Sequence, residues 1–440
     1  PGPLASPRPA ARAPTVARLI AECAEPIARI EDGVIDSLLE RIGDARVVLL
    51  GEATHGTSEF YRMRTLITQE LVLRKGFRAV AVEADWPDAS AVDRYVRHRP
   101  PRPRRWAPFA RFPTWMWRNW ETHQLIEWLR AYNGEGEHDV SFSGLDLYSM
   151  YVSAHEVVRY LDRVDRIAAE AARERYGRLT PWQHDPAAYG RAALLGRMQS
   201  CEADVVAMLR DLLAKRLEYA AQDGDEFFDA AQNARVVADA ERYYRAMYYG
   251  AAESWNLRDQ HMFDTLRSII THRGDGKVIV WEHNSHVGDA SATEMAARGE
   301  HNVGQLCRQA FGDDVFVVGF GTDHGTVAAA HAWDEPMELM SVRPARPDSY
   351  ERLCHDAGVP AFLLHLRDPV REALVDELMD ARLERAIGVV YRPDTELQSH
   401  YFQAVLPAQF DEYIWFDESE AIHPLTALQP MATTETHPLL

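Results

Sequence analysis

The segment Arg46-Val-Val-Leu-Leu-Gly-Glu-Ala-Thr-His-Gly56 joins a short apolar run to an acid, a histidine and two glycines. Runs of apolar residues with branched side chains at neighbouring positions are typical of strands that are buried on both faces. Comparable runs occur at 79–82, 140–143, 277–281, 315–318, 361–364 and 412–416. Helical patterns, for example at 59–75 and 120–132, separate several of these runs. This alternation predicts an α/β fold with a mostly parallel central sheet flanked by helices.

The pattern changes between residues 153 and 273. The stretches 154–176, 187–222 and 225–249 have apolar residues at the helical period and no strand signal. We therefore expect an all-helical lid subdomain that is inserted into the α/β core and lies above the sheet. The expected division is a disordered or extraneous tail at 1–15, the first half of the core at 16–152, the helical lid at 153–273 and the second half of the core at 274–440.

The composition excludes several classes of protein. The 440 residues include 48 Lys plus Arg and 67 Asp plus Glu, which gives a formal net charge of −19. Nucleic-acid and anionic-membrane binding depend on clustered cations, so we expect neither partner. The chain has no apolar run of about 18 residues, and its start lacks the apolar stretch of a secretory signal. Four scattered cysteines without a CxxC pair indicate a reducing compartment, and we expect a soluble, cytoplasmic protein.

Acids and histidines follow four of the predicted strands. In open α/β sheets, ligands bind beyond the carboxyl ends of the strands, so these residues are expected to meet at one edge of the sheet. They are Glu52 and His55 after the first strand, Glu83 and Asp85 after the second, Asp146 after the third, and Glu282, His283, Asn284 and His286 after the run at 277–281.

His55 is the leading candidate for a general base. It lies in a glycine-flanked turn that opens a helix, where burial and neighbouring groups can adjust its pKa for proton abstraction. Glu52 or Glu83 would orient the ring, as carboxylates commonly do for a histidine base. The alternative interpretation is that His55 only caps the following helix. Arg64, about two and a half turns further along that helix, either pairs with a site carboxylate or a substrate oxyanion or lies on a solvated surface.

His283 and His286 are three residues apart and can converge on one side of a turn or helix. They form a catalytic or transition-state-stabilising pair, or they make structural hydrogen bonds at a strand end. A third interpretation is a divalent-metal site in which nearby carboxylates complete the ligand set.

Two segments between the second and third predicted strands are unusual in composition. Residues 112–119 contain Trp115, Trp117 and Arg118, a combination that suits either a packed corner or the wall of an apolar substrate cleft. The run 97–105 is basic and proline-rich, and we interpret it as a solvated loop. The chain contains no GxSxG, Walker A or strand-linked GxGxxG motif, which disfavours serine hydrolases of that class and nucleotide binding.

The residues that follow the predicted strands, together with several other short motifs, resemble those of the erythromycin esterase family. The resemblance rests on Gly51–Phe60 with Arg64, on Glu83 and on His283–His286, with further matches at Arg258-Asp259, Met262, Ser399–Phe402 and Phe416-Asp417, and it extends over about 47–425. It implies a hydrolase that uses neither a metal nor another cofactor and opens the lactone ring of macrolide antibiotics. His55 would be the base that activates water, Glu52 and Glu83 would orient it, and His283, His286 and Arg64 would complete the site. The helical insertion would form one wall of a large cleft, with Trp115, Trp117, Arg118, Asp146, Arg258 and Asn284 as the expected substrate-binding residues.

The substrate is a separate question. The segments 112–119 and 399–425 look more like those of the broad bacterial branch of this family than those of the resistance enzymes. Glu282 departs from the small residue expected before His283 and would add a negative charge near the site. The leading prediction is hydrolysis of a small-molecule carboxylic ester or lactone, of the macrolide type. The alternatives are a divalent-metal-dependent hydrolase with the same His and Glu residues and a non-catalytic ligand-binding protein, and the sequence predicts no oligomeric state.

Overall fold

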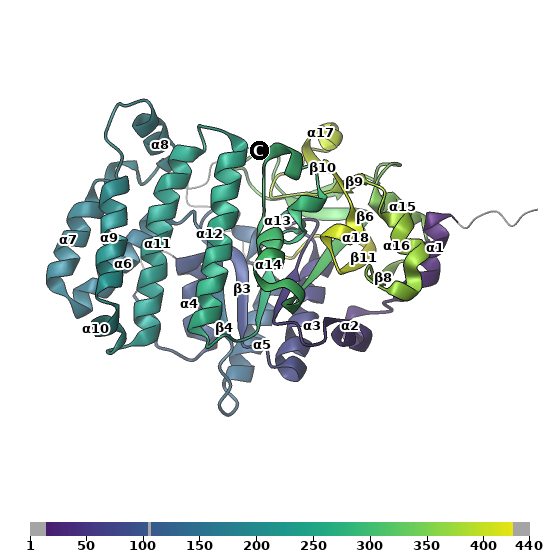
Figure 1. Ribbon diagram of the computed structural model, residues 1–440, viewed down its shortest axis with the longest axis horizontal. Coiled ribbons are helices and arrows are strands. Elements are labelled where there is room, and N and C mark those ends of the chain that lie inside the picture. Colours follow the sequence, from purple (N-terminus) through teal and green to yellow (C-terminus); the bar gives the residue numbers. More distant parts are fainter. Residues whose placement is uncertain (1–14, 104–106, 426–440) are drawn as a thin grey trace, which may run out of the picture.

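A central sheet organises the computed structural model, which describes residues 15–103 and 107–425 (Figure 1). Among these residues, nine strands form the sheet in the order β1-β8-β11-β6-β2-β5-β3-β4, with β7 paired to β6. The parallel strands are β2 (Val47–Leu50), β3 (Ala79–Asp85), β4 (Ser141–Asp146), β5 (Val278–Trp281), β6 (Val315–Ala329) and β11 (Glu412–Ser419). The antiparallel strands are β1 (Glu25–Pro26), β7 (Glu338–Val342) and β8 (Ala361–His365). The predicted α/β fold with a mostly parallel sheet is confirmed.

The middle strand β2 shows why short apolar runs form this sheet. All four of its residues are buried, and it pairs in parallel with β5 on one side and β6 on the other. Val48 and Leu50 belong to the core on one face of the sheet, whereas Val47 and Leu49 belong to the core on the opposite face. Because successive side chains point to opposite faces, a strand between two layers must be apolar at every position.

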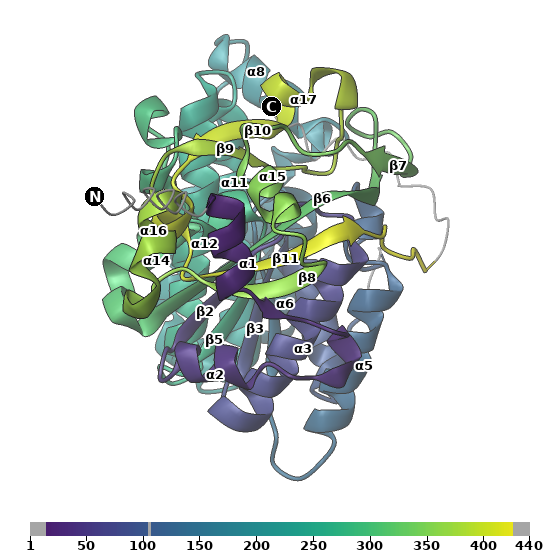
Figure 2. The same ribbon diagram turned by 90° about the vertical axis from the view of Figure 1, so that its right-hand side faces the viewer.

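Helices cover both faces of the sheet. One core contains residues of α2 (Asp36–Ile42), α3 (Ser58–Lys75), α4 (Trp86–Val96) and α5 (Trp120–Asn133). The other contains residues of α1 (Val16–Cys23), α12 (Ala251–His272), α14 (Val303–Phe311), α15 (Tyr350–Asp356), α16 (Glu372–Leu378) and α18 (Leu406–Gln409). A separate two-stranded sheet of β9 (Arg382–Arg385) and β10 (Tyr401–Ala404) lies near α17 (Glu396–His400), at the top of Figure 2.

The helices between β4 and α12 enclose a core of their own. They are α6 (Met150–Val164), α7 (Arg166–Gly177), α8 (Pro186–Leu194), α9 (Glu202–Ala214), α10 (Arg216–Ala220) and α11 (Gly224–Ala246). Of the three long helical stretches predicted here, 154–176 and 187–222 are divided into shorter helices, whereas 225–249 is the single helix α11. Asp165 illustrates the reason, because its carboxylate accepts a hydrogen bond from the backbone N–H of Ala168 and so begins α7. Figure 1 shows these helices together at one end of the molecule, beyond the edge strand β4.

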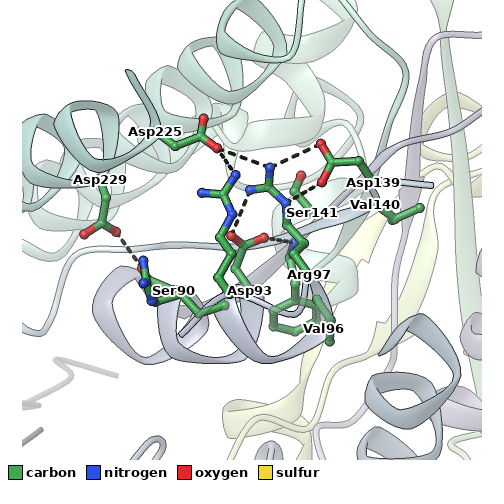
Figure 3. Close-up of polar contacts among 12 residues, drawn as sticks. Ser90, Asp93, Val96, Arg97, Asp139, Val140, Ser141, Asp225 and Asp229 are labelled. Carbon is green, nitrogen blue, oxygen red and sulfur yellow. Dashed lines mark hydrogen bonds and ion pairs between the residues drawn. The ribbon is translucent and has the colours of Figure 1, made fainter. Parts of the chain in front are cut away.

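Arginines after α4 connect this helical group to the sheet layer (Figure 3). Arg97 donates to Asp139 before β4 at 2.6 Å and to Asp225 on α11 at 3.2 Å. Arg102 donates to Glu226 and Asp229 on α11 at 2.7 and 2.6 Å. The interpretation of 97–105 as a solvated loop is wrong for this part, because these guanidinium groups are paired and mostly buried. Arg104 and Arg105 lie outside the described residues.

The structure also bears on membrane association. Within the described ranges, every helix is too short or too polar to span a bilayer.

Candidate active site

The carboxyl ends of β2, β3, β4 and β5 form one rim of the sheet, and the side chains predicted from the strand ends meet there. Glu52 and His55 follow β2, Glu83 lies near the end of β3, and His283 and His286 follow β5. The side chains of all five are at least nine-tenths buried. We call these residues, with Arg64 from α3, the rim cluster.

The turn after β2 is closely packed on both sides. A Cβ atom at Gly51 would lie 2.2 Å from Oδ1 of Asn284, and one at Gly56 would lie 2.0 Å from the carbonyl oxygen of Ala328 on β6. Only glycine fits at either position, since such contacts are far inside van der Waals distance. The two glycines therefore fix the short turn that carries Glu52 and His55.

Glu52 connects His55 to a buried arginine. Its Oε1 lies 2.7 Å from Nδ1 of His55, and its Oε2 accepts a hydrogen bond from Arg64. The guanidinium of Arg64 is fully buried, over the rings of Tyr61 and Trp281 at 4.8 and 4.5 Å. Arg64 therefore lies in the interior and not on a solvated surface. Because Nδ1 donates to the carboxylate, Nε2 of neutral His55 has a lone pair that can accept a proton.

Glu83 lies between the histidines and Arg258. Its Oε1 is 3.0 Å from a terminal nitrogen of Arg258, 3.4 Å from Nε2 of His286 and 3.9 Å from Nε2 of His55, and its Oε2 accepts from the backbone N–H of His283 at 2.9 Å. Burial alone would raise the pKa of Glu83. The positive charges of His286 and Arg258, joined by that of His55 whenever its ring is protonated, outweigh burial and hold that pKa well below its usual range.

His286 is held as a cation by two carboxylates. Its Nδ1 lies 2.9 Å from Asp259 on α12, its Nε2 faces Glu83, and Trp255 stacks against its ring. Burial would lower the pKa of His286, but Asp259 and Glu83 raise it to about 10.

His283 has the opposite state in the same short segment. Its Nδ1 accepts from the backbone N–H of Ser285 at 3.2 Å, its Nε2 is 3.2 Å from the carbonyl oxygen of Ile387, and its ring centroid is 4.9 Å from that of His55. Burial, reinforced by His55, lowers the pKa of His283 to about 3, so the ring is neutral. It begins α13 (Asn284–Val287) as the N-terminal cap.

The residues expected to bind substrate divide into two groups. Asp146 and Arg258 lie beside the rim cluster, where Arg258 donates to Asp146 at 2.6 Å as well as to Glu83. Trp117 is buried and donates from its indole nitrogen to the backbone oxygen of Glu83 at 3.2 Å. The other three have structural contacts: Trp115 packs on Phe112, Arg118 donates to the Pro108 carbonyl, and Asn284 bonds both to the N–H and to the C=O of Phe320.

The surroundings of Glu282 oppose the negative charge that its position led us to expect near the site. Its side chain is fully buried and accepts no hydrogen bond from the residues that the structure describes. Burial raises its pKa well above the ordinary value for a glutamate and so favours the neutral, protonated carboxyl.

A cleft opens beside this network. It has a volume of about 510 Å³, within the range of roughly 300–1,000 Å³ for ligand pockets. Its lining includes Asp85, Arg111, Tyr151, His155 and Arg159, from the end of β3, the segment before 112 and α6. Arg111 and Arg258 lie over the same ring of Tyr148, at 5.3 and 4.9 Å, so a single side chain separates the cleft lining from the arginine that binds Glu83.

Sequence reasoning did not assign roles to Asp259, Trp255 or Tyr148. Asp259 and Trp255 lie on α12, and the spacing of apolar residues along that helix does not indicate that one of its turns faces the rim. Asp259 was part of the family resemblance through the pair Arg258-Asp259, and that pair was the available signal.

Comparisons with known proteins agree with this architecture. The family model described as erythromycin esterase matches residues 72–419, a range that begins after the Gly51–Phe60 motif. Erythromycin esterase type II from Escherichia coli is 22% identical over 305 residues, which are 66% of this chain and 72% of that protein.

Solved structures share the fold. A succinoglycan biosynthesis protein has a TM-score of 0.76 at 21% identity, with 93% of this chain and 97% of that chain covered. A mutant of the erythromycin esterase EreC in its open conformation has a TM-score of 0.63 at 17% identity, with 89% and 95% covered. Since the family model spans well over half of the sequence, the chain belongs to the erythromycin esterase family.

Proposed function

We propose that this protein hydrolyses carboxylic esters or lactones of the macrolide type, with water activated by His55 and without a metal ion. The observation that carries the proposal is the chain of contacts from Arg64 through Glu52 to Nδ1 of His55, which leaves Nε2 of His55 as a proton acceptor beside cationic Arg258 and His286.

The charge states favour His55 over its neighbours as the base. Glu83 is a weak base near neutral pH because its pKa is held well below the usual range. His286 is already protonated, since its pKa is raised to about 10. His283 is neutral, but Nε2 faces the carbonyl of Ile387 and Nδ1 is used by Ser285.

The reaction follows from these assignments. Nε2 of His55 takes a proton from water, and the resulting hydroxide adds to the acyl carbon to form a tetrahedral oxyanion. Arg258 and His286 stabilise the negative charge that develops. The bond to the leaving oxygen then breaks, and the proton on His55 passes to that oxygen, which leaves an acid and an alcohol. In a lactone both products stay on one molecule, so the net change is the addition of one water.

The donor chemistry supports a metal-independent reaction. Of the six imidazole nitrogens in the rim cluster, five face a protein partner. The guanidinium of Arg258 lies 3.0 Å from Glu83 and 3.3 Å from Nε2 of His286 and so neutralises the carboxylate that a metal would need.

The name of the Escherichia coli relative supports a macrolide as substrate, and the cleft beside Tyr148 supports a ligand larger than a simple ester. Trp117, Asp146 and Arg258 are proposed to position the substrate. The roles proposed for Trp115, Arg118 and Asn284 are structural, through their contacts with neighbouring residues.

The test is mass-spectrometric detection of the product that has gained one water, with a panel of macrolides and simple lactones, in the presence and absence of a chelator. We expect turnover by the wild-type protein under both conditions and its loss in His55→Asn. The matched control is His261→Asn, which removes another buried histidine with a carboxylate partner, Asp239 at 2.6 Å, outside the rim cluster. Equal turnover by His55→Asn, or activity that the chelator abolishes, would refute the mechanism.

A further inference from the structure

Two histidines and two aspartates meet outside the rim cluster, where β6, α15 and β11 pack together. Asp323 and His324 are neighbours on β6, His355 lies in the last turn of α15, and Asp417 lies on β11. We propose that these four residues, the β6–α15 cluster, bind a divalent transition-metal ion.

Asp323 is the fixed member of the cluster. It is buried, and its Oδ1 accepts the backbone N–H of Ala345 at 3.1 Å, which leaves Oδ2 directed at the two rings. Oδ2 lies 2.9 Å from Nδ1 of His324 and 3.5 Å from Nδ1 of His355. Carboxylates that bind metal ions are commonly oriented in this way, with one oxygen in a hydrogen bond to the protein and the other free to bind the ion.

The separations between donor atoms fit one ion. One ligand atom each from Asp323, His324 and His355 lie within 4.8 Å of one another. Ligands at about 2.0–2.1 Å from a tetrahedral zinc ion are about 3.3 Å apart, and the distances of 2.9 and 3.5 Å to Oδ2 lie on either side of that value. Only small side-chain movements are needed to place all three on one centre.

Asp417 offers an oxygen as the fourth ligand atom. Its Oδ1 lies 2.8 Å from Nδ1 of His355, so two carboxylates converge on a single imidazole nitrogen. One proton on that nitrogen cannot serve both oxygens well, whereas a cation between them attracts both carboxylates and both rings. Arg352, one turn before His355 on α15, donates a hydrogen bond to Asp356 at 2.9 Å and so has a carboxylate partner of its own.

The cluster is accessible to solvent, unlike the rim cluster. The side chains of His324 and His355 are 37% and 35% exposed, and that of Asp417 is 26% exposed. An ion can therefore enter from solvent and retain a water ligand. Two imidazoles with carboxylates favour zinc, cobalt, nickel or copper over magnesium or calcium, which prefer sets of oxygen ligands. The bound ion would join β6, β11 and α15.

Binding of zinc by the full chain tests this proposal. Protein treated with a chelator and dialysed is titrated with zinc in a calorimeter, and cobalt is used in parallel so that its visible d–d bands report histidine and carboxylate coordination. We expect one equivalent to bind and affinity to fall at least about tenfold in His324→Asn and His355→Asn. Both positions are partly exposed, so these variants are chosen over Asp323→Asn, which would also disturb a buried hydrogen bond.

Two control variants locate the ion. His331→Asn changes an exposed histidine that is paired with Glu338 outside the cluster, and we expect no change in affinity. His286→Asn changes the rim cluster, and we again expect one equivalent to bind. The proposal is overturned if the wild-type chain shows no saturable binding, or if His286→Asn abolishes binding while His324→Asn and His355→Asn leave it unchanged.

Discussion

The imidazole of His286 lies flat against the indole of Trp255, with 4.6 Å between the ring centroids and 4° between the ring planes. The face of an indole attracts a cation, and the edge of the same imidazole meets Asp259 and Glu83. These contacts favour the protonated state and outweigh both burial and the Arg258 guanidinium, which lies 3.3 Å from Nε2. A buried histidine with this environment works as a fixed positive charge instead of a group that exchanges protons during turnover.

The first prediction concerns alkaline stability. The pKa of His286 is raised from 6.5 to about 10 in the folded protein, so its charge stabilises the fold fully below pH 6.5 and this stabilisation is lost as the pH rises towards 10. We expect the free energy of unfolding of the wild-type protein to fall between those limits by on the order of 1 kcal/mol per pH unit relative to His286→Asn. Urea unfolding at several pH values measures this difference, and parallel pH profiles for the two proteins would contradict it.

His283 gives the second prediction, with the opposite pH window. Its pKa is lowered to about 3, so between that value and 6.5 the unfolded chain binds a proton that the folded protein does not. Stability should therefore decrease as the pH falls below 6.5, and His283→Asn should remove part of that decrease. The comparison is made by urea unfolding between about pH 5 and 7, above the range in which most carboxylates titrate. An identical slope in wild type and variant would show that folding does not lower the pKa of His283.

The third prediction concerns Glu282. Because burial raises its pKa well above 4.5, the folded protein retains a proton that the unfolded chain releases, and stability falls as the pH rises above 4.5. Glu282→Gln keeps the shape of the side chain and removes the titration, so we expect a variant that is more stable than wild type at neutral and mildly alkaline pH. Thermal unfolding across that range tests the prediction. A variant that is uniformly less stable would mean that the carboxylate has a charged role.

A pair of arginines on α3 gives the fourth prediction. Arg64→Met leaves Glu52 as a buried charge without its cation, which costs about 3–5 kcal/mol of stability. Arg62→Met, two residues earlier on the same helix, removes the partly exposed partner of Glu31 and should cost less than about 1 kcal/mol. Chemical denaturation of both variants measures the contrast. Similar losses in the two would argue against the buried pair as a determinant of stability.

The fifth prediction separates Glu83 from other buried acids. Glu83→Gln keeps the side-chain volume but removes the negative charge between His55, His286 and Arg258, and we expect kcat to fall by about a hundredfold or more. Glu121→Gln alters a buried carboxylate that accepts from Ser58 at 2.6 Å away from the rim, and kcat should remain near wild type. Steady-state kinetics on the substrate found in the hydration assay distinguishes the two variants. Full activity in Glu83→Gln would remove this residue from the mechanism.

The sequence predicts which segments form strands better than it predicts how long the strands are or where the surrounding helices begin and end. Short apolar runs mark β2 and β5 because a strand between two helical layers has no polar face. The run at 315–318 covers only the start of β6, since the remainder is rich in Gly, Thr, Asp and His and is held by its pairing with β7 and β11. Asp165 divides one predicted helix by capping the next, an effect that apolar periodicity does not register.

The sequence predicts those members of the rim cluster that lie at or just after the end of a strand. Residues directly after parallel strands share an edge of the sheet, so Glu52, Glu83 and His286 could be grouped before their distances were known. Asp259 comes from a helix and the carbonyl of Ile387 from a segment after β9, and their approach depends on tertiary packing. The charge states of His283 and His286 depend on these tertiary contacts. The sequence therefore predicts where the two histidines lie but not which of them is the cation and which is neutral.

His55 and Glu52 follow β2, which has a parallel neighbour on each side, whereas one part of the cleft wall comes from α6 and α7, whose helices have a separate core. Under the proposed function, the groups that carry out the reaction and this part of the ligand-binding wall therefore have different hydrophobic cores. We therefore expect substitutions among the helices beyond β4 to change which molecules are accepted while the geometry around His55 remains as it is. A single chemistry can in this way be redirected to new compounds without being rebuilt.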